Sequence, residues 1–571
     1  MWMLLALIGC KGGGDEKEAG ILPVPTTPSD VTTGGTPSTT AVQGVADRFW
    51  ASDRVVAIDI VMTEADAAAL SAQTNDIYDL LLGEECMSEP WNGPFTWFPA
   101  DLTIDGTPLP ESGIRKKGLI GSLSTEKPSL KVELDEYVDG QEYQGLEHLT
   151  LNNAISDPSL VKQCLGYWLF AEAGLPAPRC GYADVSGAGD PLGVYVNLEP
   201  PKKIMLRNVF GEDDGDFYEG TLSDFRAGWT ETFEADTDES DASLGPVYAL
   251  TAALEIADED AMLDAVGALV DLPEFYRFWA MEVLIGHLDG YAGNTNNFYV
   301  YFPADGGPGS FVPWGIDSTF ILYDDGTLST LGVVMANSQL TRRLWQTDAG
   351  RDGYLAALDD LFATVWDEDA ILAEIDRMAA LVEPHALPDD YRAQAQEQLR
   401  DFVRGREAHL RAAMEADLPE LEEPLPAPPC LGEVGTLRVD FDAEWGTLAS
   451  PDPLSEGSST QAGDLYGDPF SIVGAVVIGE DYGYTVLAAV ALTSPTVVLE
   501  TVLYIPTWQV VPGEIELDPF SQPAYLIEID FAVSEEGVPL GMLWEGRLVL
   551  EEVDFTPGGR VRGYLEGSLV L

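Results

Sequence analysis

The sequence predicts an α+β fold for most of the chain, followed by an all-β domain at the C-terminal end. An apolar run of helical length, Phe275 to Leu288, precedes a strand-like alternation of bulky side chains over Asn297 to Phe302. A turn rich in Gly and Pro then leads into a second strand pattern, Phe311 to Ile316, so the two strands are expected to form a β-hairpin. A helix beside antiparallel strands indicates an α+β domain, which we place at residues 46–418.

A Pro-rich linker, residues 419–430, follows a charged helical stretch and separates this domain from residues 431–571. Beyond the linker, short alternating runs such as S-I-V-G-A-V-V-I and A-Y-L-I-E-I-D-F are divided by Gly, Pro and Asp. This pattern predicts an antiparallel β-sandwich or barrel. The segment shows no catalytic constellation, so we expect it to stabilise the protein or to bind a partner.

The N-terminus predicts a lipoprotein. Met1 to Gly9 is almost wholly apolar and ends in L-I-G-C, a lipobox-like sequence that makes Cys10 the residue to be acylated. The basic region and longer body of an ordinary signal peptide are missing, so either the true start lies upstream or the signal, residues 1–10, is unusually short. Residues 11–45 are rich in Gly, Thr, Pro and Ser, as in a disordered tether. No other run approaches the ~18 consecutive apolar residues of a membrane span.

The composition indicates a folded, multi-part and strongly acidic protein. At 571 residues the chain is long enough for two domains and a tail. An apolar content of 46% with 10% aromatic residues excludes a largely disordered chain. The 97 acidic residues against 29 basic ones give a net charge of −68, which repels phosphate backbones and anionic lipid headgroups. Nucleic acid is therefore not expected as a partner, and solubility or adaptation to salt explains the charge better than specific cation binding.

The most informative motif begins at His287. Asp289 lies five residues before Asn294, and a second acid, Asp317, follows the predicted hairpin. This order and spacing match the protein-kinase catalytic loop, H-x-D-x-x-x-x-N, and its downstream metal-binding Asp. In that chemistry Asp289 takes the proton of the acceptor hydroxyl, while Asn294 and Asp317 hold Mg²⁺, which prefers oxygen ligands. The structural alternative is a helix ending in a Gly- and Asn-rich turn that the acids only cap.

A series of blocks in register resembles the spore coat protein H (CotH) kinase-like family, an atypical branch of secreted protein kinases. The similarity covers roughly Asp53 to Glu407 and implies an atypical protein-kinase-like fold. Many relatives carry W-D-x-D at the second Asp block, whereas Gly315 replaces the first acid here, which puts a second metal site in doubt. Besides the two Asp blocks, the matching blocks are G-I-R-K-K-G-L-I-G-S (Gly113–Ser122), K-P-S-L-K-V-E-L (Lys127–Leu134), G-L-E-H-L-T-L-N-N-A-I-S-D-P-S-L (Gly145–Leu160), G-L-P-A-P-R (Gly174–Arg179), G-V-Y-V-N-L-E (Gly193–Glu199) and F-Y-E-G (Phe217–Gly220).

The resemblance places the nucleotide-binding groups around a glycine-bearing turn. Arg115 precedes the turn Gly118–Ser122, and Lys127 and Lys131 follow it on an expected strand. Backbone N–H groups of such a turn and strand-borne bases can contact ATP phosphates, so ATP contacts are implied for Arg115, Lys127 and Lys131. Glu199 is a candidate to pair with one of these lysines, as the helix Glu of a kinase does. Alternatively, the two lysines share the solvated face of a strand and Glu199 is a surface acid.

Cysteine usage fits an oxidising compartment. Cys164, on an expected helix Ser159–Glu172, and Cys180, on the strand after P-A-P-R, are a candidate pair, but the connectivity stays open. No C-x-x-C and no His/Cys cluster is present, so a zinc site is not expected. The cysteines other than Cys10 form an even set that allows two disulfides: Cys86, Cys164, Cys180 and Cys430.

Together these features predict a bacterial cell-envelope protein kinase, anchored through Cys10 and facing the periplasm or the exterior. It would use ATP with Mg²⁺ or Mn²⁺ to phosphorylate Ser or Thr hydroxyls of secreted, envelope or coat proteins. The alternative is a catalytically silent CotH-like surface or matrix protein that acts by binding, which the scarcity of ATP outside cells and the lone Gly315 both favour. A hydrolase using Asp289 and a water has no supporting nucleophile pattern. The oligomeric state and the natural acceptor stay open.

Overall fold

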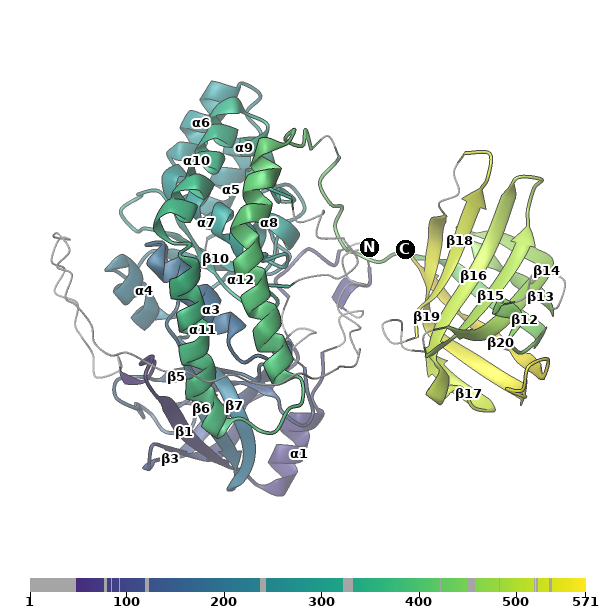
Figure 1. Cartoon of the computed structure of the whole chain (residues 1–571), viewed down its shortest axis with the longest axis horizontal. Helices are drawn as coiled ribbons and strands as arrows, with labels where there is room; N and C mark the ends of the chain where they lie inside the picture. The colour runs from purple at the N-terminus through teal and green to yellow at the C-terminus, as the bar shows by residue number, and fades with distance from the viewer. Residues whose placement is uncertain are drawn as a thin grey trace, which may run out of the picture. The chain divides into compact units, whose positions relative to one another are not determined.

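Figure 1 shows the computed structural model of the chain. Cys10 and the predicted signal and tether lie outside the residues that it describes, as do residues 119–122 of the glycine-bearing turn. The described residues are 48–75, 80–83, 85–91, 93–118, 123–236, 243–321, 332–421, 423–449, 457–481, 483–517, 519, 522–533 and 537–571.

Seven strands of the described chain close into a barrel in the order β1-β2-β3-β4-β5-β7-β6. Neighbouring strands are antiparallel, except that β1 and β6 are parallel. Leu130, Val132, Leu149 and Leu151 are buried in the barrel core, so the residues that alternate with them on β4 and β5 lie on the outer face. The strands are β1 (Val55–Val61), β2 (Phe98–Ile104), β3 (Thr107–Lys117), β4 (Ser129–Glu133), β5 (His148–Asn152), β6 (Cys180–Gly187) and β7 (Asp190–Leu198).

Three consecutive basic residues at the end of β3, Arg115, Lys116 and Lys117, are divided between the two faces of the strand. Lys116 is buried, and its Nζ donates to the carbonyl oxygens of Ser71 (3.0 Å) and Gln73 (2.6 Å) at the end of helix α1. Because side chains alternate along a strand, Arg115 and Lys117 lie on the opposite, outer face. This face carries part of the candidate site.

Helices and a small antiparallel sheet make up the next part of the chain. The sheet has the order β11-β10-β8-β9, and around it α7 packs against α10 while α11 lies beside α12 (Figure 1). The strands are β8 (Asp216–Gly220), β9 (Glu234–Ala235), β10 (Phe298–Phe302) and β11 (Ser310–Pro313). The helices are α1 (Glu64–Ala72), α3 (Lys162–Glu172), α4 (Lys203–Phe210), α5 (Gly245–Leu254), α6 (Glu259–Gly267), α7 (Leu272–Ile285), α8 (Tyr291–Asn294), α9 (Gln339–Trp345), α10 (Asp348–Thr364), α11 (Glu368–Val382), η4 (Glu383–His385) and α12 (Arg392–Glu415).

Helix α7 matches the predicted apolar helix but ends three residues earlier. It begins after Asp271, whose carboxylate accepts a hydrogen bond from the Glu274 backbone N–H at 3.1 Å. It ends at Gly286, which takes the left-handed φ of 69° that favours glycine as a helix stop. The chain therefore turns at His287 and delivers Asp289 on a loop rather than on the helix itself.

The C-terminal strands form a second, wholly antiparallel barrel. Strands β12, β13, β14, β15, β16, β18, β19 and β20 each pair with the next, and β20 pairs back with β12, which closes the ring. Strand β17 pairs with β19. The sequence predicted either a sandwich or a barrel, and this closed ring of strand pairings is a barrel. The elements are β12 (Glu433–Glu444), η5 (Thr447–Ala449), β13 (Gly457–Leu465), β14 (Asp468–Asp481), β15 (Tyr484–Leu492), β16 (Val497–Pro506), η7 (Thr507–Gln509), β17 (Gly513–Leu517), β18 (Ala524–Asp530), β19 (Val538–Val553) and β20 (Arg560–Val570).

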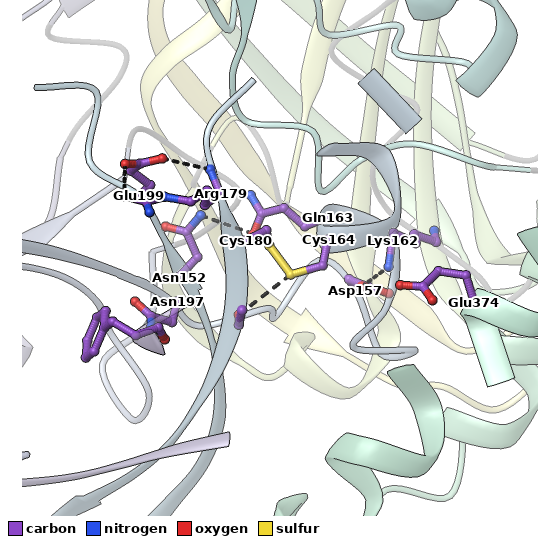
Figure 2. The surroundings of a disulfide bond; sticks show 12 residues. Asn152, Asp157, Lys162, Gln163, Cys164, Arg179, Cys180, Asn197, Glu199 and Glu374 are labelled. Carbon is purple, nitrogen blue, oxygen red and sulfur yellow. Dashed lines mark hydrogen bonds and ion pairs between the residues drawn. A yellow bond between two sulfur atoms is a disulfide. The ribbon is translucent and has the colours of Figure 1, made fainter. Parts of the chain in front are cut away.

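Two disulfides join the four described cysteines. Cys164 of α3 pairs with Cys180 at the start of β6, which fastens the helix to the first barrel (Figure 2). Cys86 pairs with Cys430, across a sequence separation of 344 residues. The candidate pair is thus confirmed, and the connectivity that the sequence left open is settled. No helix in the described part of the chain is both long and apolar enough to cross a membrane.

Candidate functional site

The loop after α7 is folded around a buried carboxylate. Glu282 is fully buried and accepts hydrogen bonds from the backbone N–H groups of Tyr291 (2.9 Å) and Ala292 (2.8 Å). These N–H groups open the short helix α8 and have no partner within it, so the carboxylate satisfies them. A Cβ at Gly290 would lie 2.2 Å from Glu282 Oε1, which leaves room only for glycine. The segment that carries Asp289 is therefore held in one conformation.

Asp289 lies at the centre of three asparagine side chains. Its Oδ1 accepts from Asn294 Nδ2 (2.7 Å) and from Asn296 Nδ2 (3.2 Å), and its Oδ2 accepts from Asn297 Nδ2 (2.7 Å). Asn297 Nδ2 also donates to the Asp289 carbonyl at 3.0 Å. Because Asn294 uses its amide nitrogen on Asp289, its Oδ1 remains for a different partner, such as a cation. The kinase-like spacing of Asp289 and Asn294 thus corresponds to a direct contact.

Asp317 follows the β10–β11 hairpin and interacts electrostatically with Asp289. Burial raises the pKa of Asp317, and the neighbouring charge of Asp289 raises it further, while Lys117 opposes both. Two carboxylates that repel each other in a poorly hydrated place favour a bound cation or a proton. Within the described residues, no group of three or more His, Cys, Asp or Glu side chains could hold a metal ion. A metal here would take the remainder of its ligands from amides, water or phosphate.

Lys117, at the end of β3, supplies the positive charge beside Asp317. Its Nζ donates to Asn152 Oδ1 at 2.7 Å and lies 5.5 Å from the ring centroid of Trp314, three residues before Asp317. Burial, and then the charge of Lys131, lower the pKa of Lys117 to about 8, although Glu219 and Asp317 act in the opposite direction. A lysine bonded to an amide rather than to a carboxylate is suited to an anionic ligand.

Arg115 and Lys131 lie next to Lys117 on the outer face of β3 and β4. They are direct cross-strand partners, and the Arg115 guanidinium lies 5.1 Å from the ring centroid of Trp97. Lys131 also moderates two acids near strand β9: burial raises the pKa values of Glu234 and Asp236, and Lys131 counteracts both shifts. The structure therefore brings Arg115 and Lys131 of the predicted phosphate contacts onto one face with Lys117, whose pKa both Lys131 and Asp317 affect.

Lys127 does not belong to this group. The prediction that Lys127 and Lys131 share one strand face is wrong, because β4 begins only at Ser129, after Pro128. The Lys127 ammonium donates to the carbonyl of Val194 at 2.8 Å and lies 4.9 Å from the ring centroid of Tyr195. Burial lowers its pKa to about 8, with a smaller effect from Arg392. An ATP contact by Lys127 stays a prediction that this geometry does not favour.

The pairing predicted for Glu199 is also wrong. Glu199 is 1% exposed, forms an ion pair with Arg179 (2.6 Å) and accepts from the Arg179 backbone N–H at 3.0 Å (Figure 2). Asn208 Nδ2 lies 3.4 Å from the same carboxylate. Its described partners thus include no lysine, because Glu199 follows β7 and meets the segment that leads into β6. The Glu199–Arg179 ion pair therefore connects the end of β7 to the residue that precedes β6.

The sequence analysis selected Arg115 but not Lys117, and it missed Asn296 and Asn297 as partners of Asp289. The alternation along β3 was the available signal, since it places Arg115 and Lys117 on one face and Lys116 on the other. Two surface cavities of about 440 and 550 Å³ in the described part of the chain are lined by other residues.

The chain belongs to the CotH kinase family. The family model described as "CotH kinase protein" matches residues 114–410, just over half of the sequence. The inner spore coat protein H of Bacillus subtilis (strain 168) is 22% identical over 265 residues, which cover 44% of this chain and 72% of that protein. The inner spore coat protein H-like protein of the same strain is 32% identical over 74 residues, or 13% of this chain and 22% of that protein.

Two solved structures are more distant. The proinflammatory kinase CtkA of Helicobacter pylori shares 11% identity at a TM-score of 0.28 and covers 50% of this chain and 94% of its own. The complex of HipA, HipB and operator DNA from the Shewanella oneidensis MR-1 toxin–antitoxin system shares 12% identity at a TM-score of 0.28, with coverages of 63% and 74%. At these TM-scores neither similarity bears on the site.

Proposed function

We propose that the protein is an ATP-dependent kinase that transfers the γ-phosphate to a Ser or Thr hydroxyl of a secreted or cell-envelope protein. The observation that carries this proposal is the arrangement of Asp289, Asn294, Asp317 and Lys117 in a member of the CotH kinase family. Phosphoryl transfer needs a carboxylate at the acceptor hydroxyl, oxygen ligands for a divalent cation and fixed positive charge for the phosphates. The four residues supply one group or more for each requirement.

Asp289 accepts the proton of the acceptor hydroxyl, since its carboxylate is oriented by three amide donors. Lys117 donates to phosphate oxygens, and it can exchange its amide partner Asn152 for them at little cost because both are hydrogen-bond acceptors. Arg115 and Lys131 add positive charge on the same face, which keeps an anionic ligand on the β3–β4 side of the site.

The donor types fit Mg²⁺ or Mn²⁺, which take hard oxygen ligands. The Asp317 carboxylate and Asn294 Oδ1 would hold the ion, whose charge would offset the repulsion between Asp289 and Asp317. When bound, such an ion supplies charge neutralisation for the transferring phosphate.

The location proposed is the cell envelope, with a lipid anchor on Cys10 and a secreted or envelope protein as acceptor. The two disulfides support this proposal, because such bonds persist in oxidising compartments. The net charge of −68 supports the proposal that nucleic acid is not a partner.

The test is transfer of labelled γ-phosphate by the purified full-length protein, with Mg²⁺ or Mn²⁺ and an acidic protein acceptor. We expect Asp289→Asn to lower turnover by about 10²- to 10⁴-fold with little change in nucleotide affinity, because Asp289 acts on the acceptor. Asp317→Ala should abolish metal-dependent nucleotide binding. The matched control is Asp305→Asn in the exposed turn of the same hairpin, which should leave both measurements unchanged. Absence of transfer with either metal would favour the silent surface protein instead.

A further inference from the structure

Asn297 connects the two acids of the candidate site. Its Nδ2 contacts both the carboxylate (2.7 Å) and the carbonyl (3.0 Å) of Asp289. Its backbone carbonyl accepts from the Trp314 N–H at 3.0 Å, at the start of the segment that leads to Asp317. One residue therefore bonds to the acid that faces the acceptor and to the segment that presents the metal ligand.

The backbone of Asn297 suits this position. Its φ is 51°, in the left-handed region that asparagine enters more readily than most residues other than glycine. This conformation turns the amide towards Asp289 while the next residue, Phe298, begins β10. An asparagine here thus suits both the backbone conformation and the hydrogen bonds.

Gly315 is complementary to Asn297. A Cβ on Gly315 would lie 2.3 Å from Asn297 Oδ1 and 2.6 Å from its Cγ, well inside contact distance. Gly315 also has a left-handed φ of 50°, which a side chain adopts only with strain. The missing side chain of Gly315 leaves room for the Asn297 amide. An acid placed at position 315 would displace that amide from Asp289.

We propose that Asn297 is a positioning residue that couples Asp289 to the Asp317 segment, and that Gly315 makes room for its side-chain amide. The proposal rests on the proposed kinase function for its catalytic consequence, but not for the contact itself. In this role Asn297 acts through Asp289 and the Trp314–Asp317 segment, and it sets the separation and orientation of the two acids. The neutral amide takes the space that an acid at position 315 would need.

The enzymatic test compares Asn297 with Asn296, whose amide also contacts Asp289 but makes no described contact with residues 314–317. Asn297→Gly keeps the left-handed backbone and removes the amide, so kcat/KM should fall by about 10²-fold, as expected when reacting groups lose alignment. Asn297→Asp keeps the shape but sets a third carboxylate against Asp289, so the acidic limb of the kcat/KM profile should move to higher pH. Both variants should also need more Mg²⁺ for half-maximal rate, whereas Asn296→Asp should move the acidic limb but leave the Mg²⁺ requirement unchanged. An unchanged Mg²⁺ requirement in both Asn297 variants would overturn the coupling.

A thermal unfolding cycle tests the contact without any activity. Gly315→Ala should lower the melting temperature of the full-length protein by more than it lowers that of Asn297→Gly, because only the wild-type background has the clash. Equal losses in the two backgrounds would show that Asn297 and Gly315 do not interact, and the proposal would fall. If the losses differ but the wild type transfers no phosphate, the proposed function fails and the positioning role fails with it, while the steric contact stands.

Discussion

If Lys117 contacts phosphate as proposed, the lowered pKa of its ammonium group makes nucleotide binding depend on pH near 8. At a pKa of about 8, roughly nine in ten Lys117 side chains are charged at pH 7 and roughly one in ten at pH 9. If only the charged form binds phosphate, the affinity for ATP·Mg²⁺ falls about tenfold between these two values. Arginine stays charged over the whole range, so Lys117→Arg should show no such decline, whatever its affinity at pH 7.

The assay is titration calorimetry with ATP at saturating Mg²⁺, from pH 7 to pH 9. Lys127→Arg is the matched control, because burial also lowers the pKa of Lys127 to about 8 although it lies away from Asp317. Wild type and Lys127→Arg should lose affinity in parallel, and Lys117→Arg should not. The assignment of the phosphate contact to Lys117 would be refuted if the ATP affinity of Lys127→Arg did not change with pH while that of Lys117→Arg still fell as in wild type.

Four further outcomes are expected. Because burial raises the pKa of Asp317, the folded state binds a proton at this carboxyl more tightly than the unfolded state does. The stability that the protonated carboxyl contributes is therefore lost as the pH rises. Calorimetry without metal should find Asp317→Asn more stable than wild type at pH 7 but not at pH 3. Arg406→Met removes donors from the last carbonyls of α7 and should cost about 1–3 kcal/mol in urea unfolding, with Arg406→Lys intermediate. Replacing Cys164 and Cys180 by serine opens a closed loop and should cost about 3 kcal/mol, whereas alkylation of both thiols without reductant would disprove the bond. Cys10→Ser should lose membrane partitioning, since each buried acyl CH₂ contributes about 0.8 kcal/mol, and equal partitioning of both forms would count against the anchor.

Local patterns predicted the elements that carry the site. The apolar run before Asp289 predicted α7, because about fourteen mostly apolar residues in a row have few alternatives to a buried helix. The alternation over Asn297 to Phe302 gave β10, and the turn rich in Gly and Pro gave the hairpin with β11. The motif spacing corresponds to a direct contact between Asp289 and Asn294, since five residues of a short loop and one helical turn can bring these side chains together.

Non-local pairing was beyond the sequence. Closure of the second barrel depends on the pairing of β19 with β20 and of β20 with β12, and alternating strands suit a sandwich equally well. Glu199 meets Arg179 only because β6 and β7 pair so that their ends coincide. The sequence itself contained the reason why Lys127 is not on β4. Pro128 has no N–H to donate to a neighbouring strand, so it lies before the strand and not within it.

The whole chain is strongly negative, whereas the candidate site also gathers positive charge at Lys117, and under the proposed function this difference gives a reason for metal and nucleotide to bind together. Several arginines elsewhere are bonded to carboxylates, as Arg400 is to Asp376 at 2.8 Å, whereas the described hydrogen-bond partner of Lys117 is an amide. The site therefore keeps a positive charge that a net charge of −68 would otherwise neutralise. Asp317 lies close enough to Lys117 to raise its pKa, and the same carboxylate repels a phosphate. Under the proposed function a divalent cation on Asp317 would remove that repulsion, so nucleotide without metal would meet a nearly neutral Lys117–Asp317 pair and nucleotide with metal would meet a cationic group.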